Sequence, residues 1–411
     1  MKNFALLLGA CLALSGLQAA QATGKTAAQP AKSSGPKHLG ELIVDVDSRK
    51  LSVSITSGSP ELATLAQTAF RSHGRYKVVS GQAQFAIKFT PAGGNQVRVD
   101  VTRGGGASVV SQVASGSSLH NALLKAADIA VEATNGLGLK GFFASKLTFI
   151  NEQGGKREVY VGNLFFSNGE VRQITNDKAS ALSPRWSHDG RKILYTSFYK
   201  SGFPDVFAID TGSYQRSTFA SFRGTNSGAR FSPTGAQVAM ILSGPGNPEL
   251  FVAGANGLNP KRLTTTKDAV EASPCFSPDG GRIVYTSDSA GGPQLYVLPA
   301  GGGVPTRLST GYAYSAEPDW SRTKPNLIAF TARSGGYQIA VYDMTKGRAT
   351  VVSKAPFDGV EPSWLADGRH IVYTARDRST SVICILDSET GQSVRISPAS
   401  WSTCQASVLA P

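Results

Sequence analysis

Apolar and polar positions repeat with a period of 44 or 45 residues along residues 141–411. In each repeat an aromatic residue precedes a turn sequence, and a strand-like apolar run follows, as in SPRWSHDGRKILYTS from Ser183. Each repeat contains four short strand-like runs, and a four-stranded unit of this length is typical of a β-propeller blade. The marker aromatic residues are Trp186, Phe231, Phe276, Trp320 and Trp364.

The turn sequence inside the repeat has a local explanation. In Ser277-Pro278-Asp279-Gly280, proline and aspartate favour a tight turn, and glycine adopts the left-handed backbone conformation. We expect the aromatic residue before each turn to pack between neighbouring blades as part of the core.

The two ends of the repeat region are incomplete and complement each other. Residues 146–175 supply the second, third and fourth strands of a blade, whereas residues 404–409 match a first strand alone. The C-terminal strand is therefore predicted to complete the first blade. This closure gives six blades and leaves no open sheet edge.

Residues 40–140 have the pattern of a small α/β domain. Ser59-Pro60-Glu61 and Ser118 are typical helix starts, and each is followed by apolar residues on one helical face. The predicted fold class is mainly β, a six-bladed β-propeller over residues 141–411 preceded by an N-terminal two-helix α/β domain. Strands of the α/β domain are expected at residues 42–44, 51–55, 76–79, 85–89 and 97–101.

The N-terminus has the features of an export signal over residues 1–22. Lys2 precedes an apolar stretch, and Ala20-Gln21-Ala22 matches a cleavage site near Ala22. We therefore expect an exported, periplasmic protein. The alternative is a lipoprotein modified at Cys11. Residues 23–39 are small, polar and basic, which predicts a flexible linker or a partner-binding epitope.

Composition narrows the function further. The formal net charge is +13, but the basic residues form no dense run with aromatic residues, which argues against nucleic-acid binding. A solvated basic surface is expected, with attraction to an acidic partner as the alternative. Removal of the signal leaves Cys275, Cys384 and Cys404, which can form at most one disulfide.

Residues suited to catalysis or metal binding are sparse. The five histidines form no H-x-H or H-E-x-x-H motif, and the chain lacks a G-x-S-x-G motif. His188 and His370 fall in or beside the blade turns, where we expect solvated side chains. The Asp-Gly pairs at 189–190, 279–280 and 367–368 are interpreted as turn residues. No catalytic residue, cofactor or metal is predicted.

The candidate site is a protein-binding face of the propeller. The loops that enter the first strands and the loops between second and third strands share one face, opposite the Ser-Pro-Asp-Gly turns. Exposed tyrosine, phenylalanine and arginine side chains on loops are typical protein-binding anchors. The predicted contact residues are Tyr199, Phe203, Phe222, Arg223, Tyr312, Tyr314, Arg333, Tyr337, Phe357 and Arg376, with Glu271, Glu317 and Glu361 at the inner rim.

The repeats resemble PD40 propeller repeats through their S-P-D-G-x-x-I-x-Y core. Together with the export signal, the α/β domain and the join GFFASKLTFI at residues 141–150, they resemble the TolB family of the Tol–Pal system. The chain departs from this pattern at the fourth turn, residues 321–324, and at Val408, which replaces the sixth marker aromatic residue.

The resemblance implies a non-catalytic periplasmic adaptor, expected to be monomeric, that supports outer-membrane integrity and division. Its propeller would bind a Pal-like peptidoglycan-associated lipoprotein, and its N-terminal region would contact a TolA-like inner-membrane protein.

Two other hypotheses stay open on the sequence alone. A propeller hydrolase or lactonase would need a metal or converging carboxylates in the central tunnel, and Glu271, Glu317 and Glu361 are the candidates. A generic exported PD40 scaffold with an unrelated partner would have the same sequence features.

Overall fold

The computed structural model describes residues 50–104, 106–167 and 169–411. Residues 51–411 form one compact unit. The predicted signal peptide, Cys11, the linker at 23–39 and the strand expected at 42–44 lie outside the described residues. Within the described part, no helix is long and apolar enough to cross a lipid bilayer.

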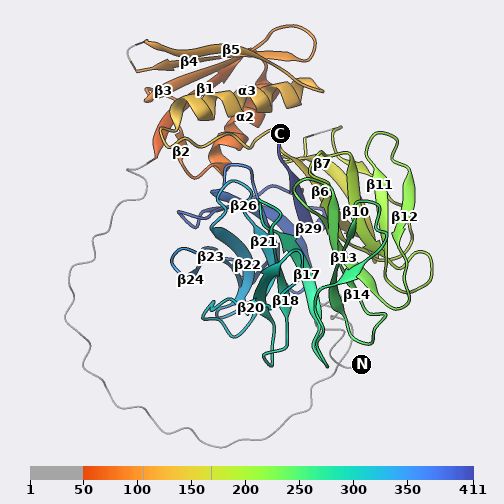
Figure 1. Cartoon of the computed structure of the whole chain (residues 1–411). Helices are drawn as coiled ribbons and strands as arrows, with labels where there is room; N and C mark the ends of the chain where they lie inside the picture. The colour runs from red at the N-terminus through yellow and green to blue at the C-terminus, as the bar shows by residue number, and fades with distance from the viewer. Residues whose placement is uncertain (1–49, 105, 168) are drawn as a thin grey trace, which may run out of the picture. The chain divides into compact units, whose positions relative to one another are not determined.

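The α/β domain is a five-stranded sheet in the order β2-β1-β3-β4-β5, with two helices on one face (Figure 1). Strand β1 pairs in parallel with β2 and β3, and the remaining neighbours are antiparallel. The elements are β1 (Leu51–Ser57), α2 (Pro60–Ser72), β2 (Tyr76–Val78), β3 (Phe85–Pro91), β4 (Gln96–Arg103), β5 (Ser108–Ser115) and α3 (Leu119–Thr134).

Serine caps start both helices, as predicted. The Ser59 hydroxyl accepts from the Leu62 N–H at 3.5 Å, and the Ser118 hydroxyl accepts from the Asn121 N–H at 3.0 Å. Each hydroxyl satisfies a backbone donor that has no partner within the first helical turn. Strand β5 was not predicted, because most of its residues are exposed at the sheet edge and no buried alternation marks them.

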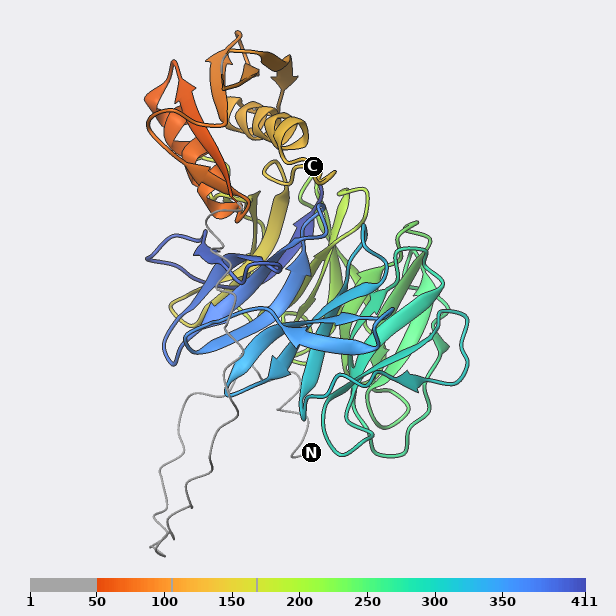
Figure 2. The ribbon, with the colours of Figure 1, turned by 90° about the vertical axis from the view of Figure 1, so that its left-hand side faces the viewer.

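Six four-stranded antiparallel sheets form the propeller blades, as predicted (Figure 2). Successive first strands contact one another around the ring. The strands of blades one to three are β29 (Ser402–Leu409), β6 (Lys146–Gln153), β7 (Lys156–Asn163) and β8 (Arg172–Gln173); β9 (Ala181–Trp186), β10 (Lys192–Ser197), β11 (Asp205–Asp210) and β12 (Arg216–Ala220); and β13 (Asn226–Phe231), β14 (Gln237–Leu242), β15 (Glu249–Gly254) and β16 (Lys261–Arg262). The strands of blades four to six are β17 (Glu271–Phe276), β18 (Arg282–Ser287), β19 (Gln294–Pro299) and β20 (Thr306–Arg307); β21 (Ser315–Trp320), β22 (Leu327–Arg333), β23 (Tyr337–Asp343) and β24 (Arg348–Val351); and β25 (Asp358–Trp364), β26 (His370–Arg376), β27 (Ser381–Asp387) and β28 (Ser393–Arg395).

The C-terminal strand closes the ring. Strand β29 pairs antiparallel with β6, from Ser402 opposite Glu152 to Leu409 opposite Lys146. The first blade therefore combines the last strand of the chain with three strands from the start of the propeller. Val408 is buried at the position of the missing marker aromatic residue.

The marker aromatic residues pack between blades, as predicted. The Trp364 indole N–H donates to the Asp319 carbonyl of the preceding blade at 3.0 Å. Phe276 belongs to a buried cluster with Ile241 and Leu250 of the preceding blade. Phe231 is the one marker that is only partly buried. The turn glycines have left-handed φ angles between 66° and 72° at Gly190, Gly235, Gly280 and Gly368.

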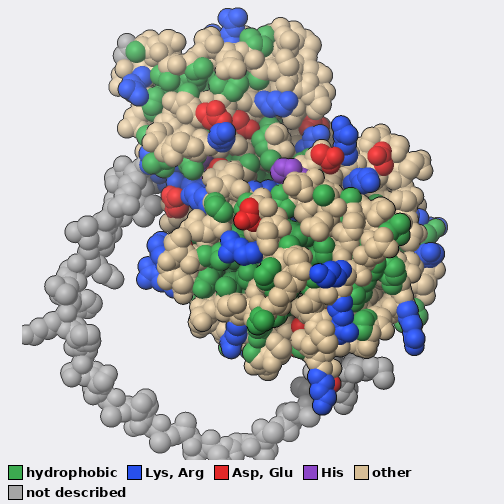
Figure 3. All heavy atoms as spheres, in the orientation of Figure 1, with side chains coloured by type: hydrophobic (Ala, Val, Ile, Leu, Met, Phe, Trp, Pro, Cys, Tyr) green, Lys and Arg blue, Asp and Glu red, His purple; other side chains and the backbone are tan. Residues whose placement is uncertain are grey.

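The three cysteines within the described residues form no disulfide. Cys275, Cys384 and Cys404 are all buried. Basic side chains are scattered among polar and apolar ones on the face shown in Figure 3, with no continuous basic patch there.

Candidate partner-binding face and channel residues

Four large aromatic side chains are exposed on the loops predicted to form the binding face. Phe203 is 66% exposed and Tyr199 50%, both between β10 and β11. Phe222, between β12 and β13, is 38% exposed, and Phe357, before β25, is 62% exposed. Exposure of this size on several loops of one face is characteristic of protein-interaction surfaces.

The loop that carries Phe222 is held by one buried side chain. Asn226 at the start of β13 accepts from the Phe222 N–H and donates to the Phe222 carbonyl, each at 2.8 Å. These two hydrogen bonds satisfy the backbone N–H and carbonyl of Phe222. The loop backbone that carries the aromatic ring is therefore fixed.

The other predicted contact residues divide into two groups. Arg223 and Arg333 are exposed, as a binding role requires. Tyr312, Tyr314, Tyr337 and Arg376 are only partly buried, and several of them contact neighbouring loops. The Tyr314 and Tyr337 rings lie 5.0 Å apart edge to face, and Arg376 lies 3.5 Å from Asp358. Burial raises the pKa of Tyr314.

Two of the three glutamates predicted at the inner rim, Glu317 and Glu361, sit on a ring of β-bulges, whereas Glu271 lies two residues before the bulge residue Ser273. Each first strand shifts register against its neighbour, and one bulge residue per blade has a left-handed φ between 50° and 63°. Such backbone is uncommon for residues other than glycine. The six bulge residues are Ser183, Gly228, Ser273, Glu317, Glu361 and Gln405.

Side chains of one bulge satisfy the backbone of the next. The Glu317 carboxylate accepts from the Glu361 N–H at 3.1 Å, and the Glu361 carboxylate accepts from the Gln405 N–H at 3.0 Å. The Gln405 side-chain oxygen in turn accepts from the Ser183 N–H at 2.8 Å. These contacts cross three successive blade boundaries, so Glu317 and Glu361 help to hold neighbouring blades together.

Glu271 and Glu361 are buried, Glu317 is partly buried, and each accepts a hydrogen bond from a hydroxyl group. Glu271 is 1% exposed and accepts from Ser287 at 2.9 Å, and Glu317 accepts from Thr331 at 2.7 Å. Burial, reinforced by Glu249, raises the pKa of Glu271 to about 7. Burial, reinforced by Glu361, raises the pKa of Glu317 to about 7.

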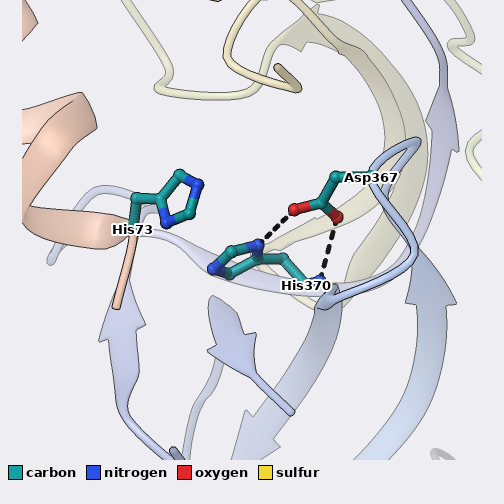
Figure 4. A group of neighbouring side chains, drawn as sticks. All are labelled: His73, Asp367 and His370. Carbon is teal, nitrogen blue, oxygen red and sulfur yellow. Dashed lines mark hydrogen bonds and ion pairs between the residues drawn. The ribbon is translucent and has the colours of Figure 1, made fainter. Parts of the chain in front are cut away.

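A buried histidine pair was not predicted from the sequence. His370 is fully buried, which corrects the expectation of a solvated side chain. Its Nδ1 lies 2.6 Å from the Asp367 carboxylate, and its ring lies 4.4 Å from that of His73 at the end of α2 (Figure 4). No local pattern predicts this pair, because His73 is far from residues 367–370 along the chain.

His73, Asp367 and His370 are the one group within the described residues whose ligand atoms could hold a metal ion, with all three atoms within 4.8 Å. The contacts between them join the end of α2 in the α/β domain to the propeller. Although burial alone would raise it, His370 lowers the pKa of Asp367 to about 2. Asp367 is thus more than a turn residue, which corrects that interpretation for the pair at 367–368.

These contacts place α2 against the side of the propeller that carries the Ser-Pro-Asp-Gly turns. Gln392, after β27, donates to the Arg71 carbonyl at 3.3 Å. Ser118 at the start of α3 bonds to Glu170, between β7 and β8. The exposed aromatic loops lie at the opposite ends of the strands, and the α/β domain leaves them uncovered.

Comparisons with known proteins agree with this architecture. A family model described as the TolB β-propeller domain, PD40, matches residues 136–407. The Tol-Pal system protein TolB of Desulfosudis oleivorans is 33% identical over 127 residues, which cover 31% of this chain and 28% of that protein. The match therefore spans less than a third of that relative.

Two solved structures share the fold. TolB from Acinetobacter baumannii superposes with a TM-score of 0.77 at 19% identity, covering 87% of this chain and 96% of that chain. Hydrazine synthase from Kuenenia stuttgartiensis gives 0.53 at 13% identity, covering 65% and 47%. At these identities the likeness concerns the fold, and the same propeller occurs in a protein named as an enzyme. Because the family model spans well over half of its residues, the chain belongs to the TolB β-propeller family.

Proposed function

We propose that this protein is a non-catalytic periplasmic adaptor of the Tol–Pal type. Its propeller binds a Pal-like peptidoglycan-associated lipoprotein, and its N-terminal region contacts a TolA-like inner-membrane protein. The protein acts as a monomer and supports outer-membrane integrity and division. Family membership and the name of the relative from Desulfosudis oleivorans support this proposal.

The observation that carries the proposal is the set of exposed aromatic side chains on one propeller face. Phe203 and Phe357 are each more than 60% exposed. Burying a phenylalanine of this exposure in a partner contributes about 1.5–3 kcal/mol. Arg223, beside Phe222, and Arg333, at the end of β22, are exposed on the same face and can add charge-assisted hydrogen bonds at the rim.

The inner-rim glutamates favour the adaptor over the hydrolase. Glu271 accepts one internal hydrogen bond on each carboxylate oxygen, from Thr266 and Ser287. Glu317 accepts two on Oε2, from the Thr331 hydroxyl and the Glu361 N–H. Their raised pKa values follow from burial within the ring, and their contacts explain why glutamate occurs there.

Binding to the soluble domain of the organism's Pal-like lipoprotein, measured by isothermal titration calorimetry, tests the proposal. We expect the double substitution Phe203→Ala with Phe357→Ala to weaken binding by at least about tenfold, since two anchors are removed. Leu258→Ala is the matched control, because Leu258 is 57% exposed on a loop at the turn side. An equal loss of affinity in the control would refute the proposed face. Absence of binding by the unaltered protein would refute the proposed partner.

The contact with a TolA-like protein has a separate test. A protein that begins at residue 40, produced without the tail at 23–39, should lose capture of the TolA-like periplasmic domain while it keeps lipoprotein binding. Retention of both interactions would exclude the tail as the TolA-contacting segment.

A further inference from the structure

A second ring of side chains lies two residues beyond the bulges, toward the Ser-Pro-Asp-Gly turns. Each of the six first strands contributes one of its members. All of them except Cys275 border a small cavity of about 20 Å³ that is also lined by three tryptophans and by Arg322. The ring consists of Arg185, Arg230, Cys275, Asp319, Ser363 and Ser407.

Positive charge exceeds negative charge around this cavity. Arg185, Arg230 and Arg322 line it, whereas Asp319 is its one acidic lining residue. Asp319 is committed to other groups, because it forms an ion pair with Arg230 and accepts from the Trp364 N–H at 2.7 Å. One carboxylate therefore faces three guanidinium groups.

Arg185 forms no direct ion pair among the described residues, and the carboxylates of Asp319 and Glu361 act on it only at longer range. Its one hydrogen bond in this part of the chain goes to the adjacent Pro184 carbonyl at 3.2 Å. Arg322 bonds to the Nδ1 atom of His188 at 3.2 Å, which supplies no negative charge. Burial, with Arg230 as the next cause, lowers the pKa of Arg185. A desolvated guanidinium that is not directly paired with a carboxylate is costly, so a bound anion would stabilise it.

Neutral donors around the cavity also lack acceptors. Trp186 is 6% exposed, lines the cavity, and its indole N–H has no hydrogen-bond partner among the described residues. The Ser363 hydroxyl oxygen accepts from the Val408 N–H at 3.3 Å, and that of Ser407 accepts from the Trp186 N–H at 3.5 Å. Each hydroxyl that accepts in this way keeps its own proton for donation.

We propose that this cavity is a recognition site for a carboxylate group carried by an acidic peptide or a small organic acid. A guanidinium fork matches a planar carboxylate. A volume of about 20 Å³ admits about one water-sized group, so one carboxylate oxygen enters while the remainder of the ligand stays outside. The Asp319–Arg230 pair shows the same recognition within the chain, and the ligand supplies the second carboxylate for Arg185. This site lies on the turn side and is independent of the proposed lipoprotein face.

Tryptophan fluorescence of the full-length exported protein, titrated with sodium acetate at constant ionic strength and pH 7.5, tests the site. Trp186, Trp320 and Trp364 line the cavity, and the chain has four tryptophans, so binding should change the signal. We expect saturation with acetate and with an N-acetylated acidic dipeptide, accompanied by a higher melting temperature. A linear, non-saturating response would overturn the proposal. Saturation by phosphate and sulfate alone would overturn the assignment to carboxylate.

Arg185→Gln should raise the apparent dissociation constant for acetate by at least about tenfold. In the absence of acetate it should also match or exceed the melting temperature of the unaltered protein, because an uncompensated cation is removed. Arg185→Lys keeps the charge without the fork and should give an intermediate constant. Arg191→Gln, which removes an 85% exposed arginine from the neighbouring turn, is the matched control. Equal acetate constants in Arg185→Gln and the control would refute the site.

Discussion

At the scale of single residues, the join between the two domains depends on the absence of a side chain. The Asp128 carboxylate of α3 accepts from the Phe143 N–H at 2.6 Å and the Ala144 N–H at 3.0 Å. A Cβ atom at Gly141 would lie 2.2 Å from an Asp128 oxygen. Burial raises the pKa of Asp128 to about 7. Glycine at this point lets the chain approach the carboxylate that holds it.

Gly141→Ala should therefore destabilise the protein by about 1–3 kcal/mol, since the added methyl group must displace Asp128 or the backbone. Urea unfolding at pH 8 measures the change. Gly301→Ala is the matched control, because nothing lies within 4 Å of a Cβ atom at that position. If both substitutions changed the free energy of unfolding equally, close approach at Gly141 would not be the cause.

At the scale of elements, the end of α2 and the turn before β26 meet through buried titratable groups. Burial, with His370 as the next cause, holds the pKa of His73 well below its ordinary value of 6.5. Asp367, Arg369 and Asp387 also act on it from the propeller side. His73 is therefore neutral in the folded protein, whereas the same side chain takes up a proton in the unfolded chain below about pH 6.5.

The sign of the pH dependence follows from this difference. Above about pH 6.5 the histidine is neutral in both states and contributes no slope. As pH falls below that value, the unfolded chain binds the proton that the folded protein excludes, and stability falls by up to about 1.4 kcal/mol per pH unit. His73→Phe should lose less stability than the unaltered protein between pH 6.5 and 5. Glu271, Glu317 and Asp128 remain in both proteins, so their opposite contribution cancels.

Unfolding in urea at several pH values provides the comparison, with His120→Gln as the control for removal of a histidine near the surface. His120 contacts Glu61 at 2.9 Å and lies away from the propeller turn. If the free energy of unfolding changed equally with pH in the unaltered protein and in His73→Phe, His73 would not be the source of the pH dependence.

At the scale of the whole molecule, ring closure by β29 decides whether the propeller has an open edge. Strand β29 covers β6, and most of its residues are buried. Without it, the backbone donors and acceptors of β6 face solvent, and the contacts of β29 with β9 and β25 are lost.

A protein that ends at Trp401 should accordingly aggregate or melt at least about 10 °C lower than the complete chain, because several kcal/mol of burial disappear. Thermal unfolding followed by circular dichroism measures this. A protein that ends at Leu409 lacks the last two residues but keeps β29 and should behave like the complete chain. An unchanged melting temperature in the protein that ends at Trp401 would show that the ring does not need this strand.

The repeat pattern was sufficient to predict six blades, their closure and the marker aromatic residues. These features follow from a short-range pattern that recurs in every repeat. The helix caps at Ser59 and Ser118 were predictable for the same local reason. Strand β5 was not, because an exposed edge strand has no buried face to impose an alternation.

The loops of the candidate face could be located from the sequence, and the binding role of that face stays a prediction. Phe203 and Phe357 are exposed there, but the burial of each side chain could not be predicted. The burial of His370 against His73, and the meeting of three arginines with Asp319, depend on residues that are distant in the sequence. Sequence by itself determined the elements, because hydrogen bonding and burial within a blade are local. Tertiary structure alone decided which charges face one another, since only ring closure and domain contact bring them within reach.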